Sequence, residues 1–377
     1  MQKLIITRET YKSHKQYSIY IKEILMHIAK SDDVYLSSRK NARCINLSNK
    51  QLKYFKAIFN LYKKIDFLLA TPRKLKDLIQ KENEICTNQL HWKTRPKKIN
   101  KILVKIFGYD QGFSKGKIIH LKTIQDQTDT SKFKYIIQYS DHLPSNNYKW
   151  GAAKFLSSLN VKYCVYCNVG GPLEWDINKN KHSHLDHFYS KSDYPFLALT
   201  LRNLIPTCER CNVSEKGTQE LPPNALNPYE GSFHESEIFH LQPLNDPNKL
   251  TIDTMINGFN KVRGKNYTIN DLLLDPIPNA PLGQNADKLA TFFKIIAKYQ
   301  EINKDNDEIN KYVIDEIYYF NKFHDKMITN LLLRLTPNER KINFYSQNPI
   351  FFIKESEINK IRFGKLIIDL CKEVGIR

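Results

Sequence analysis

The most informative segment of this chain begins with Cys164-Val165-Tyr166-Cys167 and ends with Cys208-Glu209-Arg210-Cys211-Asn212. Two CxxC pairs thus frame a segment of module size. Between the pairs lie His184-Leu185-Asp186-His187-Phe188 and Asn203-Leu204-Ile205-Pro206. Thiols therefore enclose a set of carboxylate, imidazole and amide side chains. Soft sulfur ligands and hard oxygen ligands suit two different metals, one to hold the fold and one to do chemistry.

Four cysteines predict a structural zinc site: Cys164, Cys167, Cys208 and Cys211. Zn²⁺ in structural sites takes four thiolates, and a CxxC turn lets two sulfurs reach the same ion. A single CxxC pair is also typical of redox motifs, whereas two pairs with this separation are far more specific for a metal. The alternative is two buried thiol pairs without a metal. Three isolated cysteines are expected to be ordinary thiols: Cys44, Cys86 and Cys371.

The cysteine content also bears on the compartment. The total of seven is odd, and the sequence shows neither a signal peptide nor a long apolar run. Secreted proteins usually pair their cysteines as disulfides and begin with a recognisable targeting segment. We therefore expect a cytoplasmic protein without a membrane segment, in which reduced thiols are available for zinc.

Charge is distributed unevenly along the chain. Residues 1–150 hold 30 basic and 12 acidic side chains, a net charge of +18, whereas the other residues hold 28 and 27, a net charge of +1. A polyanion would relieve the self-repulsion of so basic a segment, so we expect it to bind nucleic acid. An acidic protein partner is the alternative. The densest spots are Arg73–Lys76 and Lys93–Lys98, where Lys97 and Lys98 are expected to contact phosphate.

A length of 377 residues allows two or three domains. We expect a basic, mainly helical region for nucleic-acid or partner binding over residues 1–150. A core that carries the cysteines and the polar set should follow over residues 151–230. Residues 231–377 should form a linker and a mainly helical C-terminal region, since residues 218–250 are rich in Pro and Asn.

Hydrophobic periodicity predicts helices over these stretches: Tyr17–Ile28, Leu52–Leu69, Trp150–Leu159, 284–334 and part of 351–371. Ser48 is a candidate N-cap for the second helix, and a strand is expected near Lys117–Leu121. Within the core, strands are expected near His184–Tyr189 and Leu204–Thr207. A helix should then start at the second cysteine pair.

The core motifs resemble those of HNH endonucleases, which have the ββα-metal fold. The matching patterns are CxYC at Cys164–Cys167, DHF and KSxYP within Asp186–Pro195, NLIPxCxxCN at Asn203–Asn212, and KG at Lys216–Gly217. The resemblance covers about residues 150–230. It implies an α+β protein whose central ββα-metal nuclease core is held by structural zinc and flanked by mainly helical regions. Modules of this kind occur in bacterial anti-phage defence nucleases, so a defence role is implied.

The chain departs from the family pattern at two positions. Ser190 stands where Pro is common, and Asn227 stands where His is expected before Pro-Tyr. If that histidine contributes to the metal or substrate site, metal affinity or cleavage rate is altered here. The four residues of the expected active site are nevertheless present: Asp186, His187, Asn203 and Asn212.

Phosphodiester hydrolysis needs an attacking water, a base for its proton and a cation at the leaving oxygen. His187 is the expected base because histidine titrates near neutral pH. Asp186 and the amide oxygen of Asn212 are the expected ligands of a catalytic Mg²⁺ or Mn²⁺. Neighbours along a strand point to opposite sides. Asp186 and His187 can therefore face one site only where the strand twists or ends.

Other polar residues of the core receive supporting roles. By resemblance, Asn203 is the central asparagine, which hydrogen-bonds the loop and positions the base. Lys216 is expected to be exposed and to contact phosphate, since an exposed lysine stays protonated at neutral pH. His182 and His184 are expected to face solvent or substrate.

We therefore expect a metal-dependent HNH endonuclease, with DNA favoured over RNA as the substrate by the resemblance. The alternatives are an RNA-cleaving HNH effector and a zinc protein that binds nucleic acid without cutting it. The sequence has no ATPase motif. A regulatory partner such as an ATPase or a sensor would therefore be a separate protein.

Overall fold

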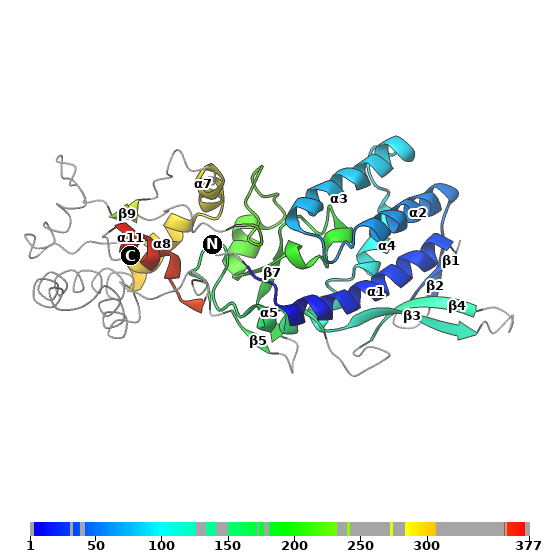
Figure 1. Cartoon of the computed structure of the whole chain (residues 1–377), viewed down its shortest axis with the longest axis horizontal. Helices are drawn as coiled ribbons and strands as arrows, with labels where there is room; N and C mark the ends of the chain where they lie inside the picture. Colours follow the sequence, from blue (N-terminus) through cyan, green and yellow to red (C-terminus); the bar gives the residue numbers. More distant parts are fainter. Residues whose placement is uncertain are drawn as a thin grey trace, which may run out of the picture.

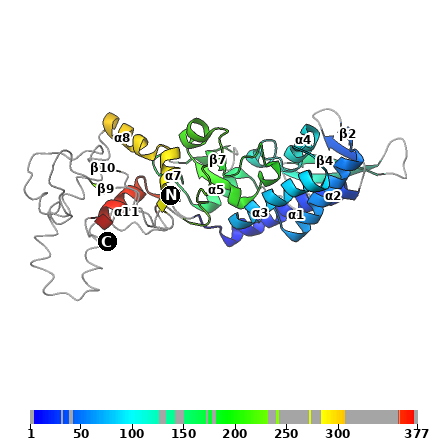
Figure 2. The same ribbon diagram turned by 90° about the horizontal axis from the view of Figure 1, so that it is seen from above.

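The structure is a computed structural model that describes residues 4–30, 33–37, 42–125, 133–140, 150–171, 173–176, 181–231, 240–241, 272–273, 283–306, 358 and 360–373. The architecture is α+β, with helices and several small sheets. The N-terminal helices lie at one end of the long axis and the cysteine-bearing segment lies in the middle (Figures 1 and 2). The last described helices lie at the other end. No helix of the described residues is long and apolar enough to cross a membrane.

Four helices dominate the N-terminal part: α1 (Arg8–Lys30), α2 (Asn49–Lys64), α3 (Pro72–Glu84) and α4 (Lys97–Ile106). The helix predicted at Tyr17–Ile28 is confirmed within α1. Ser48 caps α2 as predicted, in a capping box with Gln51. The helix expected to reach Leu69 ends at Lys64, because the Asp66 carboxylate accepts the Leu68 N–H at 3.0 Å and starts a turn.

A four-stranded sheet completes the N-terminal part. Its strands are β1 (Asp33–Ser37), β2 (Ala42–Asn46), β3 (Ile118–Gln125) and β4 (Phe133–Ser140). They lie in the order β2-β1-β4-β3, in which β1 and β4 are parallel and the other pairs antiparallel. The strand predicted near Lys117–Leu121 is confirmed as part of β3. The other three strands were not predicted, because the parallel pairing of Tyr35 with Ile136 joins distant parts of the chain.

The central part runs from a helix through two strand pairs to a short helix. α5 (Ala152–Leu159) leads into the first cysteine pair, as predicted. β5 (Trp175–Asp176) pairs with β6 (Lys181–His182). β7 (His184–His187) pairs antiparallel with β8 (Leu204–Thr207), with Asp186 opposite Ile205, which confirms both predicted core strands. The helix η5 (Arg210–Lys216), with π-helical hydrogen bonding, follows the second cysteine pair.

Three helices are described in the C-terminal part: α7 (Gly283–Phe292), α8 (Ile295–Asn306) and α11 (Gly364–Glu373). They confirm the helical prediction for residues 284–306 and for the end of 351–371, whereas residues 307–334 and 351–357 lie outside the described residues. Two short strands, β9 (His240–Leu241) and β10 (Leu272–Leu273), also pair. Short helical turns complete the fold: η1 (Ile85–Gln89), η2 (Phe113–Lys115), η3 (Pro195–Leu197) and η4 (Leu201–Asn203).

One hydrophobic core runs through the described residues, from Leu4 to Ile368. Hydrogen bonds also join the N-terminal helices to the segment before β8. The Leu201 N–H donates to the Leu68 carbonyl at 2.9 Å, and the Thr200 hydroxyl donates to the Phe67 carbonyl at 2.8 Å. The predicted regions 1–150 and 151–230 therefore share a core, and their division into domains stays a prediction.

Candidate metal centre and active site

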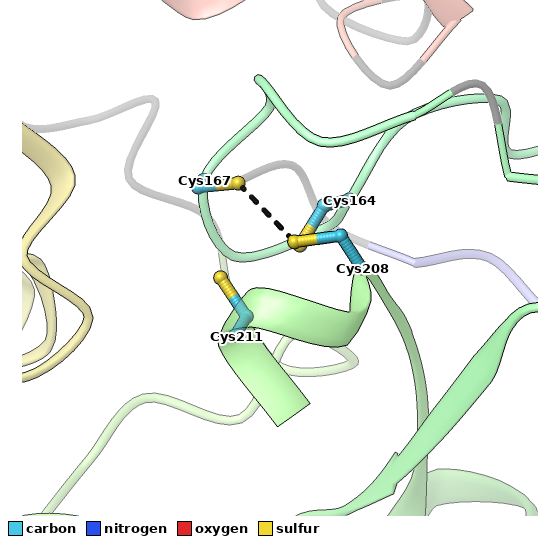
Figure 3. A group of neighbouring side chains, drawn as sticks. All are labelled: Cys164, Cys167, Cys208 and Cys211. Carbon is cyan, nitrogen blue, oxygen red and sulfur yellow. Dashed lines mark hydrogen bonds between the residues drawn. The ribbon is translucent and has the colours of Figure 1, made fainter. Parts of the chain in front are cut away.

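The four cysteines of the two CxxC pairs, here called the cysteine cluster, come together in space. Their sulfur atoms all lie within 4.8 Å of one another. Figure 3 shows one pair on the loop after α5 and the other at the start of η5, with the Cys167 and Cys208 sulfurs 3.9 Å apart. Four sulfurs about 2.3 Å from a zinc ion in a tetrahedron would lie about 3.8 Å apart. The cluster therefore fits Zn²⁺, and among the described residues it is the one such group of three or more His, Cys, Asp or Glu side chains.

The backbone turn that carries the first CxxC pair, here called the first knuckle (residues 164–170), brings the Cys164 and Cys167 sulfurs toward the same position. The turn that carries Cys208 and Cys211 is the second knuckle. The Asn168 N–H donates to the Cys164 carbonyl at 2.8 Å, and Asn168 itself adopts a left-handed conformation with φ of 57°. Asparagine tolerates this region better than most residues. The chain then passes close to the other knuckle. A side chain at Gly170 would place its Cβ 2.4 Å from the Cys208 Cβ, so only glycine fits there.

The cluster is buried beside one lysine. Hydrogen bonds from the neighbouring cysteines lower the pKa of the Cys167 thiol well below its usual range, whereas burial raises that of Cys164. The Lys298 ammonium, on α8, is 1% exposed and donates to the Cys211 sulfur at 3.1 Å. Burial disfavours its charge, but Cys211 raises the pKa of Lys298 overall. Four thiolates around Zn²⁺ carry an excess charge of about −2, which this ammonium partly offsets.

Asn168 also fastens the C-terminal part to the first knuckle. Its side-chain amide donates to the carbonyls of Ile358 and Ile361, at 3.0 and 3.2 Å. Its carbonyl oxygen accepts the Lys365 N–H at 3.0 Å. The Tyr299 hydroxyl adds a bond of 3.1 Å to the Cys167 carbonyl. Sequence analysis missed Asn168, although the sequence holds a signal: an asparagine directly follows each CxxC pair.

Asp186 lies on the face of β7 that is turned toward η5 and is 3% exposed. One carboxylate oxygen lies 2.6 Å from the Lys216 ammonium, and the other accepts the Tyr166 hydroxyl at 2.7 Å. The same ammonium donates to the His187 carbonyl. The expectation that Lys216 is exposed is wrong, because this pairing with a buried carboxylate draws it inside. Its contact with phosphate stays a prediction and would require Lys216 to leave Asp186.

His187 lies at the end of β7 and is 7% exposed. Its Nε2 lies 3.0 Å from the Ala198 carbonyl oxygen, and its ring meets the Tyr109 ring edge-on at 4.5 Å. Because the carbonyl can only accept, Nε2 carries the hydrogen and Nδ1 is the free proton acceptor. Burial, followed by the positive charge of Lys191, lowers the pKa of His187 to about 3. The imidazole is therefore neutral at pH 7.

Asn203 is fully buried between the two ends of the loop that joins β7 to β8. Its amide nitrogen donates to the carbonyls of Tyr189 and Leu197, both at 3.0 Å. Its oxygen accepts the Tyr189 N–H at 2.7 Å. Tyr189 follows the strand that carries His187, and Leu197 precedes the Ala198 carbonyl that holds the His187 ring. Asn203 thus holds the backbone next to His187 and the backbone next to the Ala198 carbonyl that the imidazole contacts, as a positioning role would require.

Asn212 lies beside His184, with the amide nitrogen 3.2 Å from the His184 Nδ1. His184 and Asp186 are two residues apart on β7, so they share a face of the strand, and His187 lies on the other. Asp186 is paired with Lys216 and Tyr166, while Asn212 contacts His184. The predicted ligands of a catalytic divalent ion therefore do not form a ready binding site in this arrangement.

The remaining predicted positions lie on the surface or support the backbone. Lys97 and Lys98 are exposed at the start of α4, where the Lys98 ammonium donates to the Asn46 carbonyl at 2.5 Å. Asn227 is buried, and its amide donates to the Arg202 carbonyl at 3.1 Å. It thereby fastens residues 227–229 to the segment before β8. The Asn227 side chain therefore has a structural role at the position where the resemblance predicted a histidine.

Comparison with known proteins gives a partial likeness. The chain is 34% identical over 83 residues to the Septu protein PtuB of Bacillus thuringiensis. The aligned residues make up 21% of this chain and span 30% of the length of that relative. The similarity is therefore limited to a segment of 83 residues, and this chain matches less than a third of the length of that relative. No protein-family model matches the chain. No solved structure matches it either.

Proposed function

We propose that this chain is an HNH-type endonuclease that hydrolyses nucleic acid, DNA in preference to RNA, as an effector of bacterial anti-phage defence. The observation that carries the proposal is the order of elements at the candidate site. β7 bears Asp186 and His187, the antiparallel β8 follows, and η5 then bears Asn212 directly beside the cysteine cluster. The similarity to a Septu protein supports the defence role.

The side chains of the site support proton transfer by His187. Its imidazole is neutral at pH 7 and its Nδ1 can accept a proton, but a pKa of about 3 makes it a weaker base than an ordinary histidine, so a bound phosphate would have to offset the charge of Lys191 and raise that pKa. Asn203 holds the two backbone segments that orient the ring. The Tyr109 ring meets the His187 ring edge-on at 4.5 Å, and the Lys191 ammonium lies 4.9 Å from the centroid of the Tyr109 ring, so a cationic side chain lies near the imidazole.

A catalytic Mg²⁺ or Mn²⁺ would supply positive charge at the leaving oxygen. Asp186 and Asn212 are hard-oxygen donors of the right chemistry. Their present partners conflict with such a site, because Asp186 already carries the Lys216 ammonium. A divalent ion at Asp186 would have to displace this internal cation.

The test is cleavage by the zinc-loaded full chain, with Mg²⁺ or Mn²⁺, on plasmid DNA and on total RNA. We expect cuts in the wild-type digest and loss of more than 100-fold in rate for His187→Ala and His187→Gln, because a general base contributes about 10²–10⁴-fold. His27→Gln, at a half-buried histidine of α1, is the matched control. Zinc content and nucleic-acid affinity should stay unchanged in all variants. Wild-type rates for His187→Gln would contradict the proposed base.

A second candidate function is a zinc-containing nucleic-acid-binding protein without catalysis. The pairing of Asp186 with Lys216 favours it, since the predicted metal ligand is neutralised within the chain. The same digests separate the two functions, because this candidate binds both substrates and cuts neither. A regulatory partner such as an ATPase or a sensor would have to be supplied before inactivity is accepted.

A further inference from the structure

A pocket of about 500 Å³ opens beside the candidate site and plays no part in the chemistry described above. Its walls come from α3 and η1, from residues 188–194 after β7, and from residues 220–225. We propose that this pocket binds one unstacked nucleobase of a single-stranded nucleic acid. The proposal rests on the proposed function, since it names the form of nucleic acid that the site takes.

One wall of the pocket is aromatic. Phe188 meets Tyr189 with ring centroids 5.2 Å apart at 77°, and Tyr189 meets Tyr194 at 6.3 Å and 90°. Tyr194 also meets Phe196 edge-on. These contacts are all edge-to-face, and Tyr189 and Tyr194 are only partly buried, so these two rings present surface to the pocket, whereas Phe188 is buried. Stacking of a base on such a ring contributes affinity whatever the base, because every base has a π-face.

The opposite wall is polar. Gln80, Asn83 and Thr87 lie on the exposed side of α3 and η1. The Gln80 amide donates to the Glu84 carboxylate at 3.0 Å and the Thr87 hydroxyl to the Asn83 carbonyl at 2.8 Å, so the Asn83 amide is the group proposed to meet the edge of a base. The charged lining residues are Lys76, Glu84 and Glu220. With two carboxylates against one ammonium, the pocket disfavours a phosphate and suits the uncharged base. The phosphate backbone would remain outside, near the basic N-terminal part.

The position of the pocket links it to the cleavage chemistry. Phe188 directly follows His187, and Asn203 binds both the N–H and the carbonyl of Tyr189. The aromatic wall and the proposed base thus belong to one fixed stretch of backbone. A base in a duplex is stacked on both faces and cannot enter unless it is extruded. The pocket therefore predicts a preference for single strands, or for duplexes with an unpaired nucleotide.

The test measures binding of a single-stranded DNA with one 2-aminopurine and of the same sequence as a duplex, in the His187→Gln background to prevent cleavage. Asn83→Trp should fill the pocket from an exposed helix position. Asn60→Trp, at an exposed position of α2 outside the pocket lining, is the matched control for the same change of side chain. We expect Asn83→Trp and Tyr194→Ala to weaken single-strand binding about tenfold and to abolish the 2-aminopurine signal, because one stacked base is lost. Tyr194→Phe should restore both, and duplex affinity should not change.

The outcomes separate this inference from the proposed function. Wild-type affinity of Asn83→Trp for the single strand would overturn the pocket assignment alone. If Asn83→Trp loses single-strand affinity but the protein with His187 intact cuts neither DNA nor RNA, the pocket assignment stands and the nuclease proposal falls. If the protein binds neither DNA nor RNA, both fall. A proline-rich peptide that binds the wild type but not Asn83→Trp, with single-strand affinity unchanged, would assign the pocket to a protein partner instead.

Discussion

Four sulfurs within 4.8 Å of one another, with a single buried ammonium beside them, are an unstable arrangement without a cation. Four thiolates at this distance repel one another, and four protonated thiols make only weak hydrogen bonds in place of metal bonds. A Zn²⁺ ion removes both costs, and its binding free energy becomes folding free energy because the unfolded chain has no such site. The charge at this point of the fold therefore depends on the metal and on Lys298 together.

Removal of one thiol tests the zinc assignment. Metal analysis of folded wild-type protein should find about one zinc per chain. Cys208→Ser should lose most of the zinc and be strongly destabilised, because three thiolates and a weak hydroxyl bind the ion poorly and a structural zinc site contributes about 10–16 kcal/mol of binding free energy to the fold. Cys86→Ser is the control, since Cys86 is even more buried than Cys208 but lies outside the cluster. Thermal unfolding and zinc content give the readout. A stable, zinc-free Cys208→Ser protein would rule out the structural zinc.

At the scale of elements, α1 is attached to the rest of the fold through a buried histidine. The His14 Nε2 lies 2.6 Å from the Leu199 carbonyl oxygen, and its Nδ1 accepts the Trp150 indole N–H at 3.1 Å. These two bonds require neutral imidazole with its hydrogen on Nε2. Burial lowers the pKa of His14 to about 4. Helix α1, the segment before β8 and the start of α5 are thus joined by a group that must not be protonated.

This arrangement predicts a loss of stability in weak acid. The folded pKa of about 4 lies below the ordinary value of 6.5, so the unfolded chain binds the proton first. His14 therefore destabilises the fold as pH falls below about 6.5, by about 2 kcal/mol at pH 5. Urea unfolding at pH 7 and pH 5 should show a loss of stability that is about 2 kcal/mol smaller in His14→Gln than in wild type, since buried His187 contributes its own loss in both proteins. The control, His91→Asn at an exposed turn, should behave like wild type. An equal pH dependence in His14→Gln would refute the assignment.

At the scale of the whole molecule, the excess of positive charge lies in residues 1–150, whose helices α1 to α4 extend from the candidate site on the side opposite α7, α8 and α11 (Figure 2). The N-terminal part contacts the loop between β7 and β8, for example through a hydrogen bond of 3.1 Å from the Arg95 guanidinium to the Asp193 carbonyl. Charge that would attract a polyanion is therefore close to the residues proposed to act on it.

Charge reversal tests this reading. Lys97→Glu with Lys98→Glu should weaken nucleic-acid binding by about tenfold at low salt and lower the slope of log affinity against log salt by about 2, because each phosphate contact releases counterions. The loss should be similar for different sequences. Lys162→Glu with Lys288→Glu, two exposed lysines of the nearly neutral remainder, is the control. If the salt slope of nucleic-acid binding is unchanged and the variant instead loses binding to an acidic protein, the basic segment binds a protein partner rather than nucleic acid.

The sequence by itself determined the features that depend on neighbours along the chain. The two CxxC pairs predicted the cysteine cluster, the apolar period predicted α1, and Ser48 predicted the start of α2. The strands β7 and β8 were also predicted near their observed bounds. Spacing and capping act within a few residues, so these features are visible before the chain folds.

Only the tertiary structure decided which partner each polar side chain takes. Asp186 meets Lys216 from 30 residues away, and Asn168 meets Lys365 from 197 residues away. The parallel pairing of β1 with β4 likewise joins distant segments. A buried polar group must find a hydrogen-bond partner, but local sequence does not say which one, because that choice depends on how the whole core packs.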